Sequence, residues 1–196
     1  LWTRQWGQAG DDDVTSLAAD ATGITAVGST LNSVYMDEMK PPQAFILRYD
    51  LAGSLLWSEI FGSPNEDVAH GVAADAAGLT VTGHTYGSLD GPNKGTFDVF
   101  VRRYDRAGKV IWATQFGTSD ADLGMDVAAD ATGFTIVGHT NGSLGGPGKG
   151  DLDLFVQRYS DAGALVYSTY FGGSQGEMTN RADIVANGDG KVTFGS

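Results

Sequence analysis

Short apolar runs rich in β-branched and aromatic residues alternate along the whole chain with glycine, aspartate and serine. Runs of about six to eight residues bounded by such turn-forming residues predict β-strands. No apolar stripe with a period of about 3.6 residues persists, so the sequence predicts no helix. In the first part of the chain the expected strands are Val14–Asp20, Ile24–Thr30, Ala44–Asp50 and Leu55–Gly62.

The strand pattern recurs at a fixed spacing. Trp57 and Trp112 lie 112 − 57 = 55 positions apart, and Trp2 and Tyr167 continue the series at the same step. A fixed period of this length is typical of a repeat architecture, in which each repeat forms one structural unit. We expect a single repeat region over residues 1–196, with units at 8–62, 63–117 and 118–172, a partial unit at 173–196, and the outer strand of a preceding or closing unit at 1–7.

The alternation of side chains indicates how the strands pack. Phe100 and Tyr104 share one face of their strand, Trp112 and Phe116 share a face of the next, and Val99 represents apolar residues of the other parity. A sheet that is apolar on both faces must be covered on both faces, which a radial stack of four-stranded sheets achieves. The sequence therefore predicts an all-β fold, a β-propeller-like array of four-stranded antiparallel blades with about 3.5 repeats. A three-layer solenoid is the alternative.

The repeat motif resembles a known family. It reads W-x-x-x-F-G, then V-A-A-D-A-x-G-x-T-x-x-G-H-T, then D-x-F-V-x-R-Y-D-x-x-G. This pattern is similar to the bacterial β-propeller repeat family, whose SBBP-type repeats are described as seven-bladed. The resemblance implies a module of a secreted or cell-surface bacterial protein, located outside the cell, at its surface or in the periplasm. It brings no catalytic residues. The first repeat departs from the motif at Ser29, Gln43 and Trp6.

A seven-bladed ring would need 7 × 55 = 385 residues, against the 196 of this chain. Open blade faces would expose large aromatic residues and unpaired strand edges. Three arrangements would cover them: the chain is a fragment of a longer protein, a partner chain completes the ring, or Leu1–Gly7 closes a four-bladed ring. We expect part of a larger or partner-completed ring, so further blades of the same or another chain are expected partners.

Charge and composition exclude several classes of partner. The formal net charge is −12, with 24 acidic and 12 basic residues, so we expect no nucleic-acid binding. No apolar run approaches the roughly 18 residues that span a bilayer, so we expect no membrane insertion. Cysteine is absent, which excludes disulfides and thiolate metal sites.

Acidic residues and histidines recur at equivalent positions and are candidate metal ligands. Clustered oxygens suit calcium, so the recurring acids could bind it, but such carboxylates more often accept bonds from loop N–H groups. These acids are Asp12, Asp67, Asp122 and Glu177. His84 and His139 are expected too far apart to share a metal, and each is expected to bond to the following threonine or a loop carbonyl. His70 is expected to face solvent. We therefore expect no cofactor, metal or catalytic residue.

The segment that departs most from the other repeats is Leu31–Pro42, LNSVYMDEMKPP. It replaces a glycine-rich loop with aromatic and methionine side chains next to a stiff proline pair, a composition that suits contact with a partner. The candidate partner-binding residues are Val34, Tyr35, Met36, Met39, Pro41 and Pro42. The alternative is that they pack over the rim of their own blade.

The sequence therefore predicts a non-enzymatic structural and protein-interaction module that binds through its rim loops. The alternative is a propeller enzyme, or a carbohydrate- or cofactor-binding domain, with its site at the central axis. An axial site would require a funnel lined by polar groups from several blades.

Overall fold

The structure is a computed structural model that describes residues 1–31, 40–144, 152–172, 183–186 and 192–195. Every regular element in this part of the chain is a β-strand. The strands are β1 (Asp12–Asp20), β2 (Gly23–Thr30), β3 (Gln43–Tyr49), β4 (Leu55–Phe61), β5 (Asp67–Ala74), β6 (Leu79–Thr85), β7 (Asp98–Tyr104), β8 (Val110–Phe116), β9 (Asp122–Asp130), β10 (Gly133–Thr140), β11 (Asp153–Ser160), β12 (Leu165–Phe171), β13 (Asp183–Ala186) and β14 (Val192–Gly195). The described residues contain no helix able to span a membrane.

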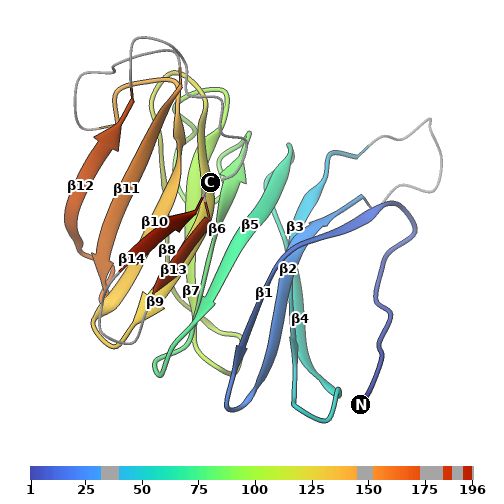
Figure 1. The fold of residues 1–196 in the computed structure, drawn as a ribbon. Helices are drawn as coiled ribbons and strands as arrows, with labels where there is room; N and C mark the ends of the chain where they lie inside the picture. The colour runs from blue at the N-terminus through green and yellow to red at the C-terminus, as the bar shows by residue number, and fades with distance from the viewer. Residues whose placement is uncertain (32–39, 145–151, 173–182, 187–191, 196) are drawn as a thin grey trace.

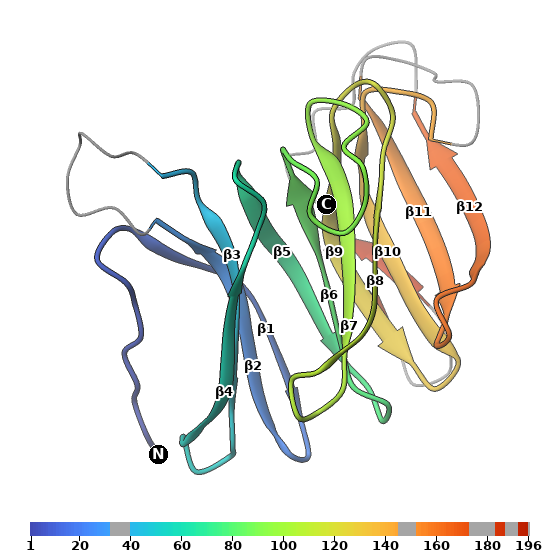
Figure 2. The same ribbon diagram turned by 180° about the vertical axis from the view of Figure 1, so that it is seen from behind.

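Twelve of these strands form three antiparallel sheets in chain order, β1-β2-β3-β4, β5-β6-β7-β8 and β9-β10-β11-β12, and β13 pairs with β14. Figures 1 and 2 show the three sheets side by side. The first strand of the middle sheet, β5, contacts the first strands of the other two sheets, β1 and β9. β5 packs against β1, β2 and β3, and β9 packs in the same way against β5, β6 and β7. The chain is therefore all-β, with repeated four-stranded sheets arranged like propeller blades in an array that is not closed. This confirms the predicted fold class.

An arginine on the third strand of each sheet ties that strand to the hairpin before it. Arg103 donates from Nη1 to Thr80 Oγ1 at 2.7 Å and from Nη2 to Asp75 Oδ1 at 2.7 Å. Arg48 and Arg158 make the equivalent bonds in the other two sheets. Arg103 is only 1% exposed, and a buried guanidinium needs such partners to offset the loss of water. The arginine of the R-Y-D motif is thus a structural residue.

A tryptophan on the outer strand of one sheet lies on a glycine turn of the next. The indole nitrogen Nε1 of Trp57 donates to the backbone oxygen of Arg106 at 3.0 Å. A Cβ on Gly108 would lie 2.7 Å from Trp57 Cδ2, and Gly108 has a φ of +88°, so both space and backbone require glycine. The same indole-on-turn contact joins Trp2 with Gly53 and Trp112 with Gly163.

Residues 1–7 lie against the first sheet without forming a strand. Trp2 is 5.9 Å from Tyr49 and Trp6 is 4.7 Å from Phe45 between ring centroids, as expected for an outer strand packed on the next blade. A strand also needs a hydrogen-bonded neighbour, and no described residue pairs with this segment. Residues 1–7 therefore make the aromatic contacts that the repeat pattern predicts, but they do not pair with a described strand.

The apolar core lies between sheets. One buried cluster joins Val27 and Ile46 of the first sheet to Phe100 and Tyr104 of the second. A second cluster joins the other face of the middle sheet, including Val101, to the third sheet. The middle sheet is therefore covered on both faces, as the apolar residues of both parities require.

Replacing Trp57 by alanine tests the indole-on-turn contact. We expect Trp57→Ala to lower the free energy of unfolding by about 3–5 kcal/mol, because a large ring leaves a packed interface. Leu56 is the matched control, since it is adjacent and 53% exposed, and Leu56→Ala should change the same quantity by less than about 0.5 kcal/mol. Urea denaturation measures both. Equal losses in the two variants would show that Trp57 does not hold the sheets together.

Candidate functional site

Neighbouring sheets meet through three layers of side chains. Phe100, Arg102 and Tyr104 alternate along β7 and therefore share the face that meets the first sheet. On the opposing strand β4, Trp57 stacks on Tyr104 with centroids 5.9 Å apart, and Phe61 meets Phe100 edge-on at 5.6 Å. Between the second and third sheets the outer layers are again aromatic, with Phe116 6.2 Å from Phe155 and Trp112 5.7 Å from Phe134. The middle layer differs in charge as well as in size.

In the first interface the middle layer is filled by Arg102. Its guanidinium lies 4.3 Å from the centre of the Phe61 ring. It also donates to Asp90 from Nε at 2.7 Å and from Nη2 at 2.9 Å, and to Glu59 at 3.2 Å. Burial disfavours the charge and is the largest single influence, but the hydrogen bonds and charges of the neighbouring groups, Asp90 first and then Tyr104, together outweigh it and hold the pKa of Arg102 above its ordinary value. The Arg102 side chain is thereby packed at this interface, with 11% of it exposed.

In the second interface the equivalent positions carry smaller, uncharged residues. One repeat later, the counterpart of Arg102 is Gln157 (102 + 55 = 157) and the counterpart of Glu59 is Thr114 (59 + 55 = 114). The counterpart of Asp90 in the sequence is Gly145 (90 + 55 = 145). Between β8 and β11 a groove of 470 Å³ is open to solvent at this level. Its volume is within the range of about 300–1,000 Å³ typical of small-molecule pockets.

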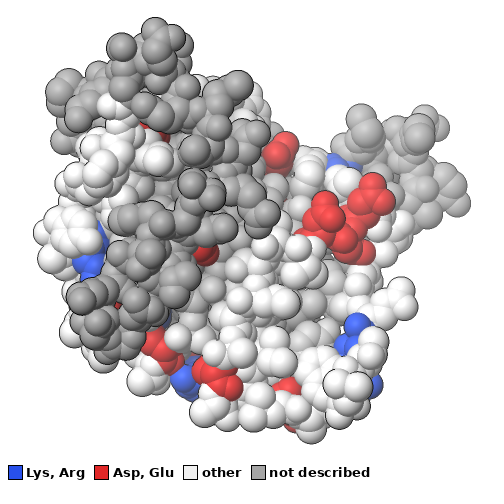
Figure 3. Space-filling model, in the orientation of Figure 1, with Lys and Arg blue, Asp and Glu red and all other residues white. Residues whose placement is uncertain are grey.

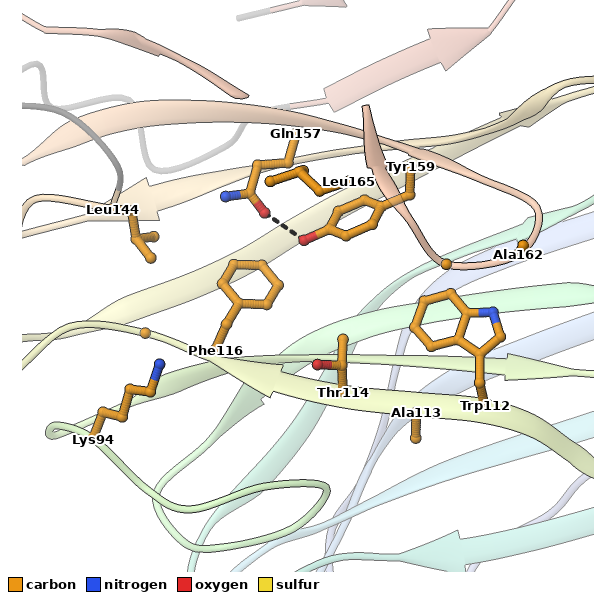
Figure 4. Close-up of a pocket in the computed structure, with 12 residues that line it drawn as sticks. Lys94, Trp112, Ala113, Thr114, Phe116, Leu144, Gln157, Tyr159, Ala162 and Leu165 are labelled. Atoms are coloured by element: carbon orange, nitrogen blue, oxygen red, sulfur yellow. Dashed lines mark hydrogen bonds between the residues drawn. The ribbon is translucent and has the colours of Figure 1, made fainter. Parts of the chain in front are cut away.

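Aromatic rings and hydrogen-bonding groups both face this groove (Figure 4). Phe116 and Tyr159 border it from opposite sheets, Trp112 lies at one end and Lys94 at the other. The Tyr159 hydroxyl donates to Gln157 Oε1 at 2.6 Å. Burial raises the pKa of Tyr159, so the phenol stays protonated and remains a donor. This bond uses the amide oxygen of Gln157 and leaves its NH₂ group for other acceptors.

A second candidate site is a histidine pair at a β-bulge. The register between β5 and β6 shifts between Ala69 and Gly71, so His70 is the extra residue of the bulge. His70 Nε2 lies 2.8 Å from His84 Nδ1, and His84 Nε2 lies 3.3 Å from Glu66 Oε1. The three side chains form a hydrogen-bonded series that occurs in the second repeat alone.

The histidine pair is neutral near pH 7. Burial lowers the pKa of His70 to about 4, with a further contribution from His84, and burial lowers the pKa of His84 to about 4. The ring centroids are 4.9 Å apart, so the rings lie nearly end to end and their facing nitrogens serve each other as donor and acceptor. Metal ligation would instead require both lone pairs to converge on one ion. Within the described residues, no group of three or more His, Asp or Glu side chains is placed to hold a metal.

Two expectations about the histidines are wrong. His84 bonds to His70 and Glu66 rather than to a threonine or loop carbonyl, and His70 turns toward His84 rather than to solvent. The bulge re-aims the side chain, which a regular strand pattern does not predict. His139 has Met125 at the bulge position of its own sheet and no hydrogen-bond partner for Nε2 among the described residues. The available signal in the sequence was that position 70 carries a histidine, whereas the equivalent positions carry Thr15 and Met125.

The recurring acids brace the loops between sheets. Asp67 accepts from the N–H and hydroxyl of Ser63 at 2.6 and 3.0 Å, and Asp122 accepts from Thr118 at 2.6 and 2.9 Å. Asp12 accepts from a loop N–H at 2.9 Å. Burial raises the pKa of Asp67 and of Asp122. The interpretation as loop carboxylates is confirmed for these three, and one oxygen of each is engaged by its loop.

Some predicted residues lie outside the described part of the chain. They are Val34, Tyr35, Met36, Met39 and Glu177. Pro41 and Pro42 are described and half-buried, directly before β3. The Pro42 carbonyl accepts from the N–H of Asp67 at 2.9 Å, so Pro42 joins the first sheet to the second. Pro41 lines a pocket of 280 Å³ together with Lys40 and Ile60.

Comparison with known proteins gives one distant similarity. Over 171 residues the chain is 28% identical to the regulatory protein FlaEY of Caulobacter vibrioides. The match covers 77% of this chain and 18% of that protein, so the chain spans less than a fifth of its relative. No family model matches the chain. The resemblance to the bacterial β-propeller repeat family therefore stays a prediction.

The histidine pair predicts a pH-dependent stability. Both pKa values fall from about 6.5 in an unfolded chain to about 4 in the folded protein. Between these values the unfolded chain binds protons that the folded chain does not, so the free energy of unfolding should be highest above about pH 6.5 and fall as the pH drops toward about 4.

The variant His70→Thr/His84→Ser carries the residues found at these positions in the first repeat, Thr15 and Ser29. We expect its unfolding free energy to change less over this pH range, as measured by urea denaturation at several pH values. His139→Ser removes a single histidine whose pKa burial also lowers, and should reduce the pH dependence by a smaller amount. An unchanged slope in the double variant would contradict the assignment.

Proposed function

We propose that the chain is a non-enzymatic structural and protein-interaction module that binds a partner protein at the rim of its first sheet. The observation that carries the proposal is the pocket beside Pro41, which lies where the first repeat departs most from the others. This use of the rim agrees with the general placement of binding residues on loops carried by a rigid scaffold.

The residues that the repeats share are already engaged in holding the fold. Trp57 lies on a turn of the next sheet, Arg103 joins strands within a sheet, and Asp67 braces a loop. Groups engaged in this way are poorly placed for chemistry on a substrate. Binding specificity is therefore better attributed to positions at which the repeats differ.

The pocket beside Pro41 has the character of a contact site for an apolar side chain. Lys40, Pro41 and Ile60 line it, together with Pro64 from the loop before β5. Ile60 is 43% exposed, although it is a large apolar residue. Gln43, one of the departures of the first repeat, also lines the pocket, and its Nε2 donates to the backbone oxygen of Asn65 at 2.9 Å. An apolar anchor on a partner protein would remove the exposed apolar surface from water.

The last complete sheet offers a second contact surface. Tyr167 and Phe171 of β12 are 48% and 53% exposed, whereas their counterparts Trp112 and Phe116 pack on the next sheet. A further blade, from the same or another chain, fits this face by continuing the repeat. We include in the proposal a larger or partner-completed ring and a secreted or cell-surface location, as the resemblance implies. The distant relative is named a regulatory protein, and a role in regulation by binding belongs to the same proposal.

Ile60→Glu tests the rim site. A charge in the pocket should reduce capture of a specific partner from extracts of the source cells by about tenfold or more, since a lost apolar anchor costs about 1.4 kcal/mol or more. Ile111→Glu is the matched control because Ile111 lies on an outer strand and is 54% exposed. Quantitative mass spectrometry of captured proteins provides the measurement, with thermal unfolding to confirm that both variants fold. Identical captured sets for wild type and Ile60→Glu would contradict the proposal.

A further inference from the structure

We propose that the groove between the second and third sheets is a binding site for one pyranose ring of a neutral saccharide. This site is separate from the rim pocket beside Pro41. It lies between β8 and β11, and its described lining includes none of the residues predicted to contact a partner.

The internal repeat supplies a reference for what the groove lacks. In the first interface the Arg102 side chain occupies the corresponding space and stacks on Phe61. In the second interface the counterpart Gln157 is shorter, and Phe116, the counterpart of Phe61, faces the open groove (Figure 4). The second interface therefore keeps an aromatic platform, and the residue at the position of Arg102 is the shorter, uncharged Gln157.

A pyranose matches the two kinds of surface in the groove. The C–H groups of a sugar ring form an apolar face that packs on an aromatic ring, and here Phe116 and Tyr159 supply such rings from opposite sides. The hydroxyl groups at the edge of the sugar need donors and acceptors. Thr114 supplies a hydroxyl that can serve as either, and Lys94 supplies donors.

The Gln157 amide is oriented to donate to a ligand. Its oxygen accepts from the Tyr159 hydroxyl at 2.6 Å, which fixes the amide plane and directs the NH₂ group away from that bond. The neighbouring bond from Nε2 to Ser168 Oγ is long, at 3.4 Å. In Figure 4 the amide nitrogen and the Lys94 ammonium are both drawn on the side of Leu144, so the donors gather at one end of the groove.

Charge favours a neutral ligand over an ionic one. The first interface holds its arginine with Glu59 and Asp90, whereas the described residues that line the second groove include no carboxylate, so they offer no counter-ion to a cationic ligand. The net charge of −12 opposes anions in general, and acidic side chains lie on the face of the molecule seen in Figure 3. A neutral, hydroxyl-rich ring satisfies both conditions.

Saturation-transfer NMR with the methyl glycosides of glucose, galactose, mannose and N-acetylglucosamine tests the proposal on the 196-residue chain. We expect at least one glycoside to receive saturation from the protein. Gln157→Arg should abolish the signal because the longer side chain fills the groove, as Arg102 does in the first interface. Lys94→Ala and Thr114→Val should each weaken binding by about tenfold, the loss expected for one hydrogen-bonding group.

Lys109→Ala is the control for Lys94→Ala, because both lysines are exposed and Lys109 lies outside the groove. If Gln157→Arg does not fold, Lys94→Ala and Thr114→Val decide the result. The proposal is overturned if no glycoside binds, if the groove variants bind like wild type, or if only a charged sugar such as methyl glucuronide or a peptide competes for the site. Ile60→Glu should leave glycoside binding intact, because Ile60 lines the rim pocket and not the groove. A failure of the saccharide proposal is therefore distinguishable from a failure of the proposed rim site.

Discussion

The packing of a tryptophan on a glycine turn of the next sheet is the contact on which the array depends. The Trp57 ring occupies the space where a side chain on Gly108 would begin, so the two positions must remain a large ring and a glycine. Because the middle sheet is apolar on both faces, it needs a neighbour on each side to remove those faces from water. The contact therefore sets how closely successive sheets approach, and every other layer of the interface must fit that separation.

This constraint explains where the repeats can differ. The aromatic outer layers must be present in each interface, whereas the middle layer can change without altering the spacing. Arg102 fills that layer in the first interface, and Gln157 leaves it open in the second. The bulge position is another point of freedom, because the residue there is not needed for the strand ladder, and His70 uses it to reach His84. Both candidate sites thus arise at positions that the packing does not fix.

Most of the fold could be predicted from the sequence. Strand positions follow from local alternation and turn residues, and β1 begins only two residues before the predicted Val14. Strand alternation also assigned Trp112 and Phe116 to a packing face, and both pack against the third sheet. The groove could not be predicted, because strand parity does not reveal that Gln157 faces Thr114 on another sheet. Rim contact by residues 32–39 stays a prediction, since it falls outside the described residues.

The sequence by itself determined the all-β repeat, its period and the residues that pack between sheets, because these depend on side-chain alternation and on turns within a few residues of each other. Only the tertiary structure decided what the interfaces enclose. In the first interface Arg102 meets Glu59 and Asp90, which come from two other segments of the chain. In the second interface a groove lies beside Gln157 instead. The pairing of His70 with His84 likewise depends on a bulge that places two strands out of register, which alternation alone does not encode.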